Sequence, residues 1–78
     1  MANVTIYTTP TCVYCKMTKE FFQKNNVPYE EKNVATDAVA RDHMIQKSGQ
    51  MGVPVIEVDD KIIIGFDQPR LKEALSLK

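Results

Sequence analysis

The spacing of apolar residues changes several times along this chain, and this alternation constrains the fold more than any other feature. Residues 4–7 are rich in β-branched and aromatic side chains, and residues 8–11, which include Pro10, interrupt the strand. From Cys12 the apolar spacing becomes helical. One face of that helix carries Tyr14, Met17, Thr18, Phe21 and Phe22. The beginning of the chain therefore predicts a strand that leads directly into an amphipathic helix.

Strand and helix signals also alternate over the rest of the chain. They predict a weak strand over residues 29–34, a helix from Thr36 or Asp37 to about residue 47, strands over residues 55–58 and 61–64, and a last helix capped by Asp67. Asp59-Asp60 suggests a tight hairpin between the third and fourth strands. The order β-α-β-α-β-β-α predicts an α/β fold. We expect a four-stranded mixed sheet with three flanking helices, in which the first two strands are parallel.

The length and charge of the chain limit its organisation and its partners. A chain of 78 residues has room for one core, so we expect a single domain over residues 1–78. Ten basic and ten acidic residues cancel, which gives no electrostatic reason to expect nucleic acid as a partner. The N-terminus lacks the pattern of a signal peptide, and no stretch approaches the roughly 20 apolar residues needed to cross a membrane. We therefore expect a cytoplasmic monomer that binds neither nucleic acid nor membrane.

The two cysteines suggest the chemistry. Cys12 falls at the start of the first predicted helix, and Cys15 lies one turn further in. Residues three apart on a helix are neighbours, and a Cys-x-x-Cys pair beside a β-α-β pattern is the thioredoxin-like redox signature. Half of a zinc site is the alternative, but it needs four ligands, and the chain adds only His43 and scattered carboxylates. His43 is more simply a partly buried helix residue, so we expect no metal site.

The position of each cysteine predicts its role. An ordinary thiol has a pKa near 8.5, and bringing it to about 7 takes roughly 2 kcal/mol of preferential stabilisation of the thiolate. A helix dipole supplies about 0.3–1 kcal/mol. The remainder must come from free N–H groups of the first turn, from the Cys15 thiol or from Lys16 nearby. We therefore expect Cys12 to attack a disulfide and Cys15 to resolve the product.

Four segments of the chain together resemble one family. They are Tyr7, Thr11-Cys12-Val13-Tyr14-Cys15, Gly52-Val53-Pro54 and Gly65-Phe66-Asp67. In this order and spacing they resemble the glutaredoxins and glutaredoxin-like redoxins over essentially the whole chain. The resemblance implies a thioredoxin-like fold and a dithiol redox enzyme.

The resemblance also implies roles for individual residues. Pro54 matches the cis-proline of the family, and the Val53 backbone beside it would pair with the extended backbone of a substrate. The N–H groups of Phe66 and Asp67 would hold the γ-glutamyl carboxylate of glutathione, as helix N-termini hold anions, and the Asp67 carboxylate would face its ammonium. Tyr14 either lines this site or packs in the core.

The chain departs from the family pattern at three places. Val13 stands where many glutaredoxins have Pro, and Thr9 stands where many have a Lys that serves the glycyl carboxylate. The Gly65-Phe66 pair resembles redoxins that take electrons from thioredoxin reductase, although their usual nearby Trp is missing. The thiol chemistry is compatible with all three departures, whereas the identity of the reductant depends on them.

The sequence therefore predicts an enzyme that reduces protein disulfides, glutathione mixed disulfides or both. Its partners would be disulfide-containing proteins and glutathione as co-substrate, and we expect no bound cofactor. One alternative is a redoxin reduced by thioredoxin reductase that donates electrons to a specific enzyme such as ribonucleotide reductase. Another is an iron–sulfur carrier, in which two chains share a cluster through their Cys12 thiolates and glutathione.

Overall fold

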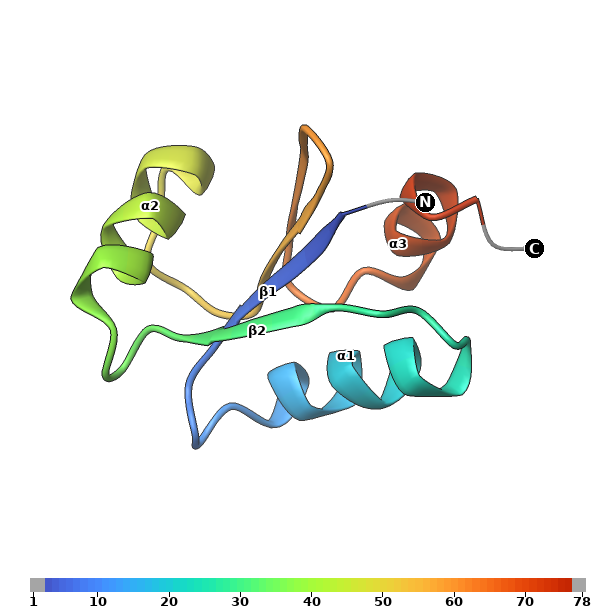
Figure 1. Ribbon diagram of the computed structural model, residues 1–78, viewed down its shortest axis with the longest axis horizontal. Helices are drawn as coiled ribbons and strands as arrows, with labels where there is room; N and C mark the ends of the chain where they lie inside the picture. The colour runs from blue at the N-terminus through green and yellow to red at the C-terminus, as the bar shows by residue number, and fades with distance from the viewer. Residues whose placement is uncertain (1–2, 77–78) are drawn as a thin grey trace.

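The computed structural model describes residues 3–76 and has the predicted order of elements. These are β1 (Val4–Thr8), α1 (Val13–Lys24), β2 (Glu30–Asn33), α2 (Ala38–Ser48), β3 (Val55–Val58), β4 (Lys61–Ile64) and α3 (Gln68–Ala74) (Figure 1). The strands form one sheet in the order β2-β1-β3-β4. Strand β1 is parallel to β2 and antiparallel to β3, and β3 is antiparallel to β4. The predicted mixed sheet, its parallel first pair and its hairpin are confirmed.

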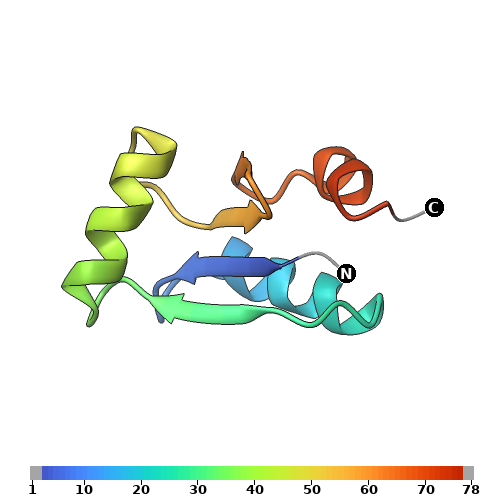
Figure 2. The same cartoon turned by 45° about the horizontal axis from the view of Figure 1, so that its top comes forward.

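Helices cover both faces of this sheet. Successive side chains of a strand point to opposite faces, so Ile6 and Tyr7 of β1 belong to two separate apolar clusters. Ile6 shares its cluster with Phe22 of α1 and Leu71 of α3, while Tyr7 shares its cluster with Met44 of α2. Helices α1 and α3 therefore cover one face and α2 covers the other. Figure 2 shows α2 apart from the other two helices, across one end of the strands.

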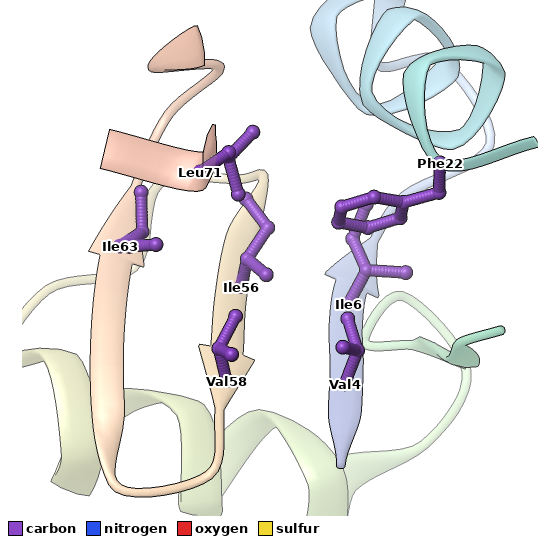
Figure 3. Packing of buried hydrophobic residues seen from close by; sticks show 7 residues of the cluster. All are labelled: Val4, Ile6, Phe22, Ile56, Val58, Ile63 and Leu71. Carbon is purple, nitrogen blue, oxygen red and sulfur yellow. The ribbon is translucent and has the colours of Figure 1, made fainter. Parts of the chain in front are cut away.

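The larger cluster joins three strands to two helices. It consists of Val4, Ile6, Phe22, Ile56, Val58, Ile63 and Leu71 (Figure 3). Each of these side chains is at most 6% exposed, and full burial of one such side chain stabilises a fold by roughly 1.5–3 kcal/mol. Leu71 is the buried residue of the short helix α3, so this contact fixes α3 beside the sheet.

The ends of α2 follow the signals in its sequence. Asp37, rather than Thr36, is the N-cap residue, and its side chain accepts a hydrogen bond from the Ala40 N–H at 3.0 Å. Gly49 ends the helix with a positive φ of 73°, a left-handed conformation that glycine adopts at little cost. The turn between β3 and β4 likewise places Asp59 at a φ of 53°.

The predicted apolar face of the first helix was only partly correct, because it included Thr18 and Phe22, which are buried, but not Cys15. The buried residues of α1 are Cys15, Thr18 and Phe22. Tyr14 and Met17, which were assigned to that face with Phe21, are 61% and 40% exposed. Cysteine packs as a small apolar residue, so the stripe through Cys15 is the one that faces the sheet. The neighbouring stripe is left partly in solvent.

Three smaller expectations also changed. Strand β1 extends to Thr8, one residue past the predicted end, whereas β2 is shorter than predicted at both ends. His43 is exposed on α2, so the expectation of a partly buried side chain was wrong.

Within residues 3–76, no helix has the length and apolar character that crossing a membrane requires.

Candidate active site

The cysteine pair lies where β1 gives way to α1. Cys12 is the N-cap residue of α1 and has extended backbone angles, and Cys15 lies in the first turn. The N–H of Cys12 donates to the Thr9 carbonyl oxygen at 3.2 Å, which closes the loop between strand and helix. The Cα atoms of Cys12 and Cys15 are 5.2 Å apart and their sulfurs form a disulfide. The predicted pairing of the two sulfurs on one helix end is therefore observed.

The two cysteines have different surroundings. Cys15 is 1% exposed on the buried face of α1, whereas Cys12 is half-buried. The sulfur of Cys12 accepts a hydrogen bond from the Cys15 N–H at 3.0 Å, at the position where an N-cap oxygen usually accepts one. Only Cys12 is accessible to an incoming disulfide, and the same N–H can stabilise a thiolate there.

A polar network ties the beginning of α1 to the sheet. The Thr8 hydroxyl of β1 and the Lys19 ammonium of α1 both donate to one carboxylate oxygen of Glu31 in β2, at 2.7 and 2.9 Å. The Lys19 hydrogen bond, followed by that of Thr8, holds the pKa of the Glu31 carboxyl below its usual range. Since Thr8 precedes the cysteine loop and Lys19 follows Cys15 by one turn, this network fixes both sides of the cysteine segment.

The sequence did not predict this network. The signal that could have found it is the two-residue alternation of β1, which places Thr8 on the same face as Ile6 and therefore under α1. Ending the strand at residue 7 concealed that signal. Thr8 is 2% exposed, so its hydroxyl depends on Glu31 as a partner.

Two segments singled out by the family resemblance lie together beside the cysteine loop. The bond between Val53 and Pro54 is cis, as predicted. The Pro54 carbonyl oxygen accepts a hydrogen bond from the Gly65 N–H at 2.8 Å, which joins segment 52–54 to segment 65–67. Because Val55 pairs with Tyr7 across the sheet, Pro54 lies next to the end of β1, from which the cysteine loop departs.

Asp67 acts as a helix cap in this structure. Its carboxylate accepts a hydrogen bond from the Arg70 N–H at 3.2 Å, and its second oxygen lies 3.5 Å from the Arg70 Nε. Phe66 is half-buried, and its ring packs edge-on against Phe21 with centroids 6.0 Å apart. The binding roles of Phe66 and Asp67 toward glutathione remain predictions, as does that of Thr9, which is half-buried.

Exposed apolar side chains flank the cysteine loop. Val13 and Tyr14, which follow Cys12, are 68% and 61% exposed, so packing of Tyr14 in the core is excluded. Met51, shortly before the half-buried Val53, is 69% exposed. Apolar surface beside an accessible sulfur favours contact with another peptide chain.

Comparisons with known proteins agree with this geometry. A sequence model of the glutaredoxin family matches residues 4–63. The chain is 42% identical over 72 residues to an uncharacterized glutaredoxin-like 8.6 kDa protein encoded in the rubredoxin operon of Clostridium pasteurianum, covering 92% of this chain and 96% of the relative. It is 40% identical over 67 residues to glutaredoxin 3 of Escherichia coli K12, covering 86% of this chain and 81% of the relative.

Solved structures agree as well. The fold superimposes on the T8A mutant of the thioredoxin-like protein BC3987 with a TM-score of 0.93, at 32% identity over the full length of both chains. It superimposes on the glutaredoxin-like NrdH-redoxin of Escherichia coli with a TM-score of 0.82, at 27% identity, covering 91% of this chain and 92% of that chain. The fold is thus thioredoxin-like. From the family match over residues 4–63 and the cysteine pair, the chain belongs to the glutaredoxin family.

Proposed function

We propose that this protein reduces disulfides of proteins and mixed disulfides of glutathione through Cys12 and Cys15. The observation that carries the proposal is the asymmetry of the pair. Cys12 is accessible and its sulfur accepts the Cys15 N–H, while Cys15 is buried one turn away and can reach only Cys12. A nucleophile and a resolving thiol need this arrangement.

The reaction balances with these two residues alone. The Cys12 thiolate attacks one sulfur of the target disulfide, forms a mixed disulfide and expels the other target sulfur as a thiolate. Cys15 then loses its proton and attacks the Cys12 sulfur, which releases the second target thiol. Two electrons pass to the target, and the enzyme ends with the Cys12–Cys15 disulfide. Because the electrons move between sulfur atoms, the reaction needs no bound cofactor.

Glutathione is the proposed co-substrate that restores the dithiol. The family and the order of its motifs support this choice, with Thr9, Tyr14, Val53 and Phe66 as proposed contacts. The Asp67 carboxylate would interact with the γ-glutamyl ammonium while it caps α3, since a carboxylate oxygen can accept more than one hydrogen bond.

Thioredoxin reductase is a second candidate for the reductant. The Escherichia coli NrdH-redoxin is described as a glutaredoxin-like protein with a thioredoxin-like activity profile, and this chain shares its fold. Thr9 in place of a lysine, together with the Gly65-Phe66 pair, supports the same candidate.

Coupled assays that consume NADPH test the two reductants directly. A mixed disulfide of glutathione and hydroxyethyl thiol is supplied with either glutathione plus glutathione reductase or thioredoxin reductase alone, and Cys12→Ser serves as the inactive control. Turnover that depends on glutathione is the expected result. Turnover with thioredoxin reductase alone would identify this enzyme, and not glutathione, as the electron source. No turnover with either reductant would contradict the proposed function.

A further inference from the structure

A groove between α1 and α3 lies beside the proposed glutathione site and shares Phe66 with it, while its other lining residues lie outside that site. Its volume is about 400 Å³, and its walls include Met17, Glu20, Phe21 and Lys24 on α1, and Phe66 and Lys72 on or next to α3. In Figure 1, α1 runs from the cysteine loop to the end of the molecule at which α3 lies.

The floor of the groove is apolar. The rings of Phe21 and Phe66 meet edge-on at 6.0 Å, and both residues are half-buried. Met17 is 40% exposed at the end nearer to the cysteines. Aromatic edges and a flexible thioether accommodate an apolar or aromatic side chain of a ligand.

The rim of the groove is positively charged. Lys24 and Lys72 are exposed on its two walls, and neither forms an ion pair with another residue of the described range 3–76. Glu20 is the acidic side chain of the lining, four residues before Lys24 on the same helix. Two cations against one anion favour a ligand that brings carboxylates.

The groove lies further along the helix that begins at the reactive cysteine. Val13, Met17 and Phe21 follow one another at intervals of four residues, so they form a ridge along α1 from its N-cap residue Cys12 into the groove. At 1.5 Å per residue, Lys24 lies about 18 Å along the axis from Cys12. An extended peptide covers about 3.3 Å per residue, so about five or six residues of a bound segment span this distance.

We propose that this groove binds an extended acidic segment of the protein whose disulfide is being reduced. An apolar side chain of the segment packs on Phe21 and Phe66, and carboxylates about five or six residues from the target cysteine pair with Lys24 and Lys72. The proposal rests on the proposed disulfide reductase function and names the class of protein substrate that the enzyme prefers.

Peptides that carry one cysteine in a mixed disulfide with thionitrobenzoate test this preference, because attack by Cys12 releases a coloured thiolate. One peptide has a phenylalanine followed by two glutamates about five and six residues from its cysteine. Matched peptides have two glutamines or two lysines there, have the glutamates beside the cysteine, or have serine for the phenylalanine. Each is made with the tail on either side of the cysteine, since the groove does not fix the direction of the chain.

The acidic peptide should react roughly three- to tenfold faster than the glutamine peptide in one of the two directions at low ionic strength, because two exposed ion pairs contribute modestly. Salt should reduce this ratio, and the lysine peptide should be slowest. The peptide with serine for phenylalanine and the peptide with glutamates beside the cysteine should each react only slightly faster than the glutamine peptide. In the Glu20→Gln enzyme, the rate ratio of the acidic peptide to the glutamine peptide should increase.

A charge-reversed enzyme provides the decisive comparison. The double variant Lys24→Glu with Lys72→Glu should prefer the lysine peptide over the glutamate peptide. Arg41→Glu, an exposed reversal of one charge on α2 at the other face, should keep the original preference. Circular dichroism establishes that the variants are folded.

The outcomes separate the two proposals. Fast release from every peptide without a preference, or a preference that the double variant retains, would overturn binding in the groove and leave the redox chemistry standing. No release from any peptide or from the symmetrical thionitrobenzoate disulfide would overturn the proposed function itself.

Discussion

The single hydrogen bond from the Cys15 N–H to the Cys12 sulfur distinguishes the two thiols of this protein. It lies at the helix end where backbone N–H groups lack partners within the helix, so it stabilises a thiolate more than a neutral thiol. The second sulfur lies inside the fold and has no comparable access to solvent. Nucleophilicity is therefore expected to belong to one residue and not to the pair.

Alkylation of the reduced protein should follow this difference. Cys12 is expected to react with iodoacetamide well below pH 8, because its thiolate is stabilised, while Cys15 reacts slowly because it is 1% exposed. Mass spectrometry of timed samples across pH measures both rates. Equal rates at every pH would contradict the assignment of roles.

Replacing the resolving thiol should separate two routes of reduction. Cys15→Ser is expected to abolish the reduction of protein disulfides, since no thiol remains to attack the mixed disulfide on Cys12. Removal of glutathione from glutathionylated peptides should survive, because a second glutathione can take the place of Cys15. Cys12→Ser should lose both activities. Loss of both in Cys15→Ser would show that glutathione does not resolve the intermediate.

The residue at position 9 should tune the use of glutathione. Thr9→Lys restores the ammonium that many glutaredoxins direct at the glycyl carboxylate, and an exposed pair of this kind contributes about 0.2–1 kcal/mol. The apparent KM for glutathione should fall by several-fold at most, and salt should reduce the gain. Thr9→Gln, which adds length without charge, is the matched control. An unchanged KM in Thr9→Lys would place the glycyl carboxylate away from this position.

Among the elements, α1 and β2 depend on each other through Glu31. The carboxylate joins Thr8, Lys19 and its own strand, and the pKa of Glu31 is lowered in the folded protein. A carboxyl group whose pKa falls on folding stabilises the fold above its unfolded pKa, and this contribution is lost as pH falls through the folded value. Because the ion pair is 29% and 38% exposed at its two side chains, solvent screening keeps the effect small.

The acid limb of the stability curve should therefore depend on Glu31. Glu31→Gln is expected to cost about 0.5–1 kcal/mol near neutral pH and progressively less as pH falls through the lowered pKa of the folded carboxyl, because the wild-type group is then protonated. Urea unfolding at several pH values measures this difference. Glu30→Gln, an exposed neighbour on β2, is the control and should leave the pH dependence intact. A cost of Glu31→Gln that is the same at pH 3 and pH 7 would rule out the charge as its origin.

The alkaline limb involves the opposite face. Lys47 of α2 pairs with Glu57 of β3 at 2.8 Å, and this hydrogen bond raises the pKa of Lys47. A lysine whose pKa rises on folding contributes below its unfolded pKa, and the contribution disappears as pH rises through the folded value. The two pairs thus act at opposite ends of the pH range.

The order of the elements was predictable because strand and helix periods alternate and because prolines, glycines and capping aspartates separate them. Asp37, Gly49 and Asp67 mark their helix ends by local chemistry alone. The position of both cysteines at one helix end was predictable on equally local grounds. Local sequence did not predict which stripe of α1 faces the sheet, because two neighbouring stripes are apolar and only the docking of the helix selects Cys15 over Tyr14. The Glu31 network and the groove were missed for the same reason, because each depends on how separate elements lie against one another.

At the scale of the whole molecule, stability depends on a few side chains that connect the helices to one sheet. Leu71→Ala is expected to destabilise the protein by about 2–5 kcal/mol, because it leaves a cavity between α3 and the sheet. A domain of this size has roughly 4–12 kcal/mol in total, so α3 would loosen and the Gly65–Asp67 segment with it. Chemical denaturation measures the loss. Glu73→Ala, exposed on the same helix, should change stability by less than about 0.5 kcal/mol. A comparable effect of both substitutions would mean that Leu71 does not hold α3 in place.

The strand order also leaves β2 at one border of the sheet, with a row of backbone donors and acceptors that no other strand of the sheet covers. Such a border can pair with the same border of another molecule and begin aggregation. The chain has no net charge, so long-range repulsion between copies is weak near neutral pH. Strand β2 carries Glu30, Glu31 and Lys32 among its four residues, and a parallel, in-register pairing of two such borders would place like charges side by side. Charged residues on an edge strand oppose edge-to-edge pairing in general, so Glu30, Glu31 and Lys32 are expected to limit the aggregation of a chain without net charge.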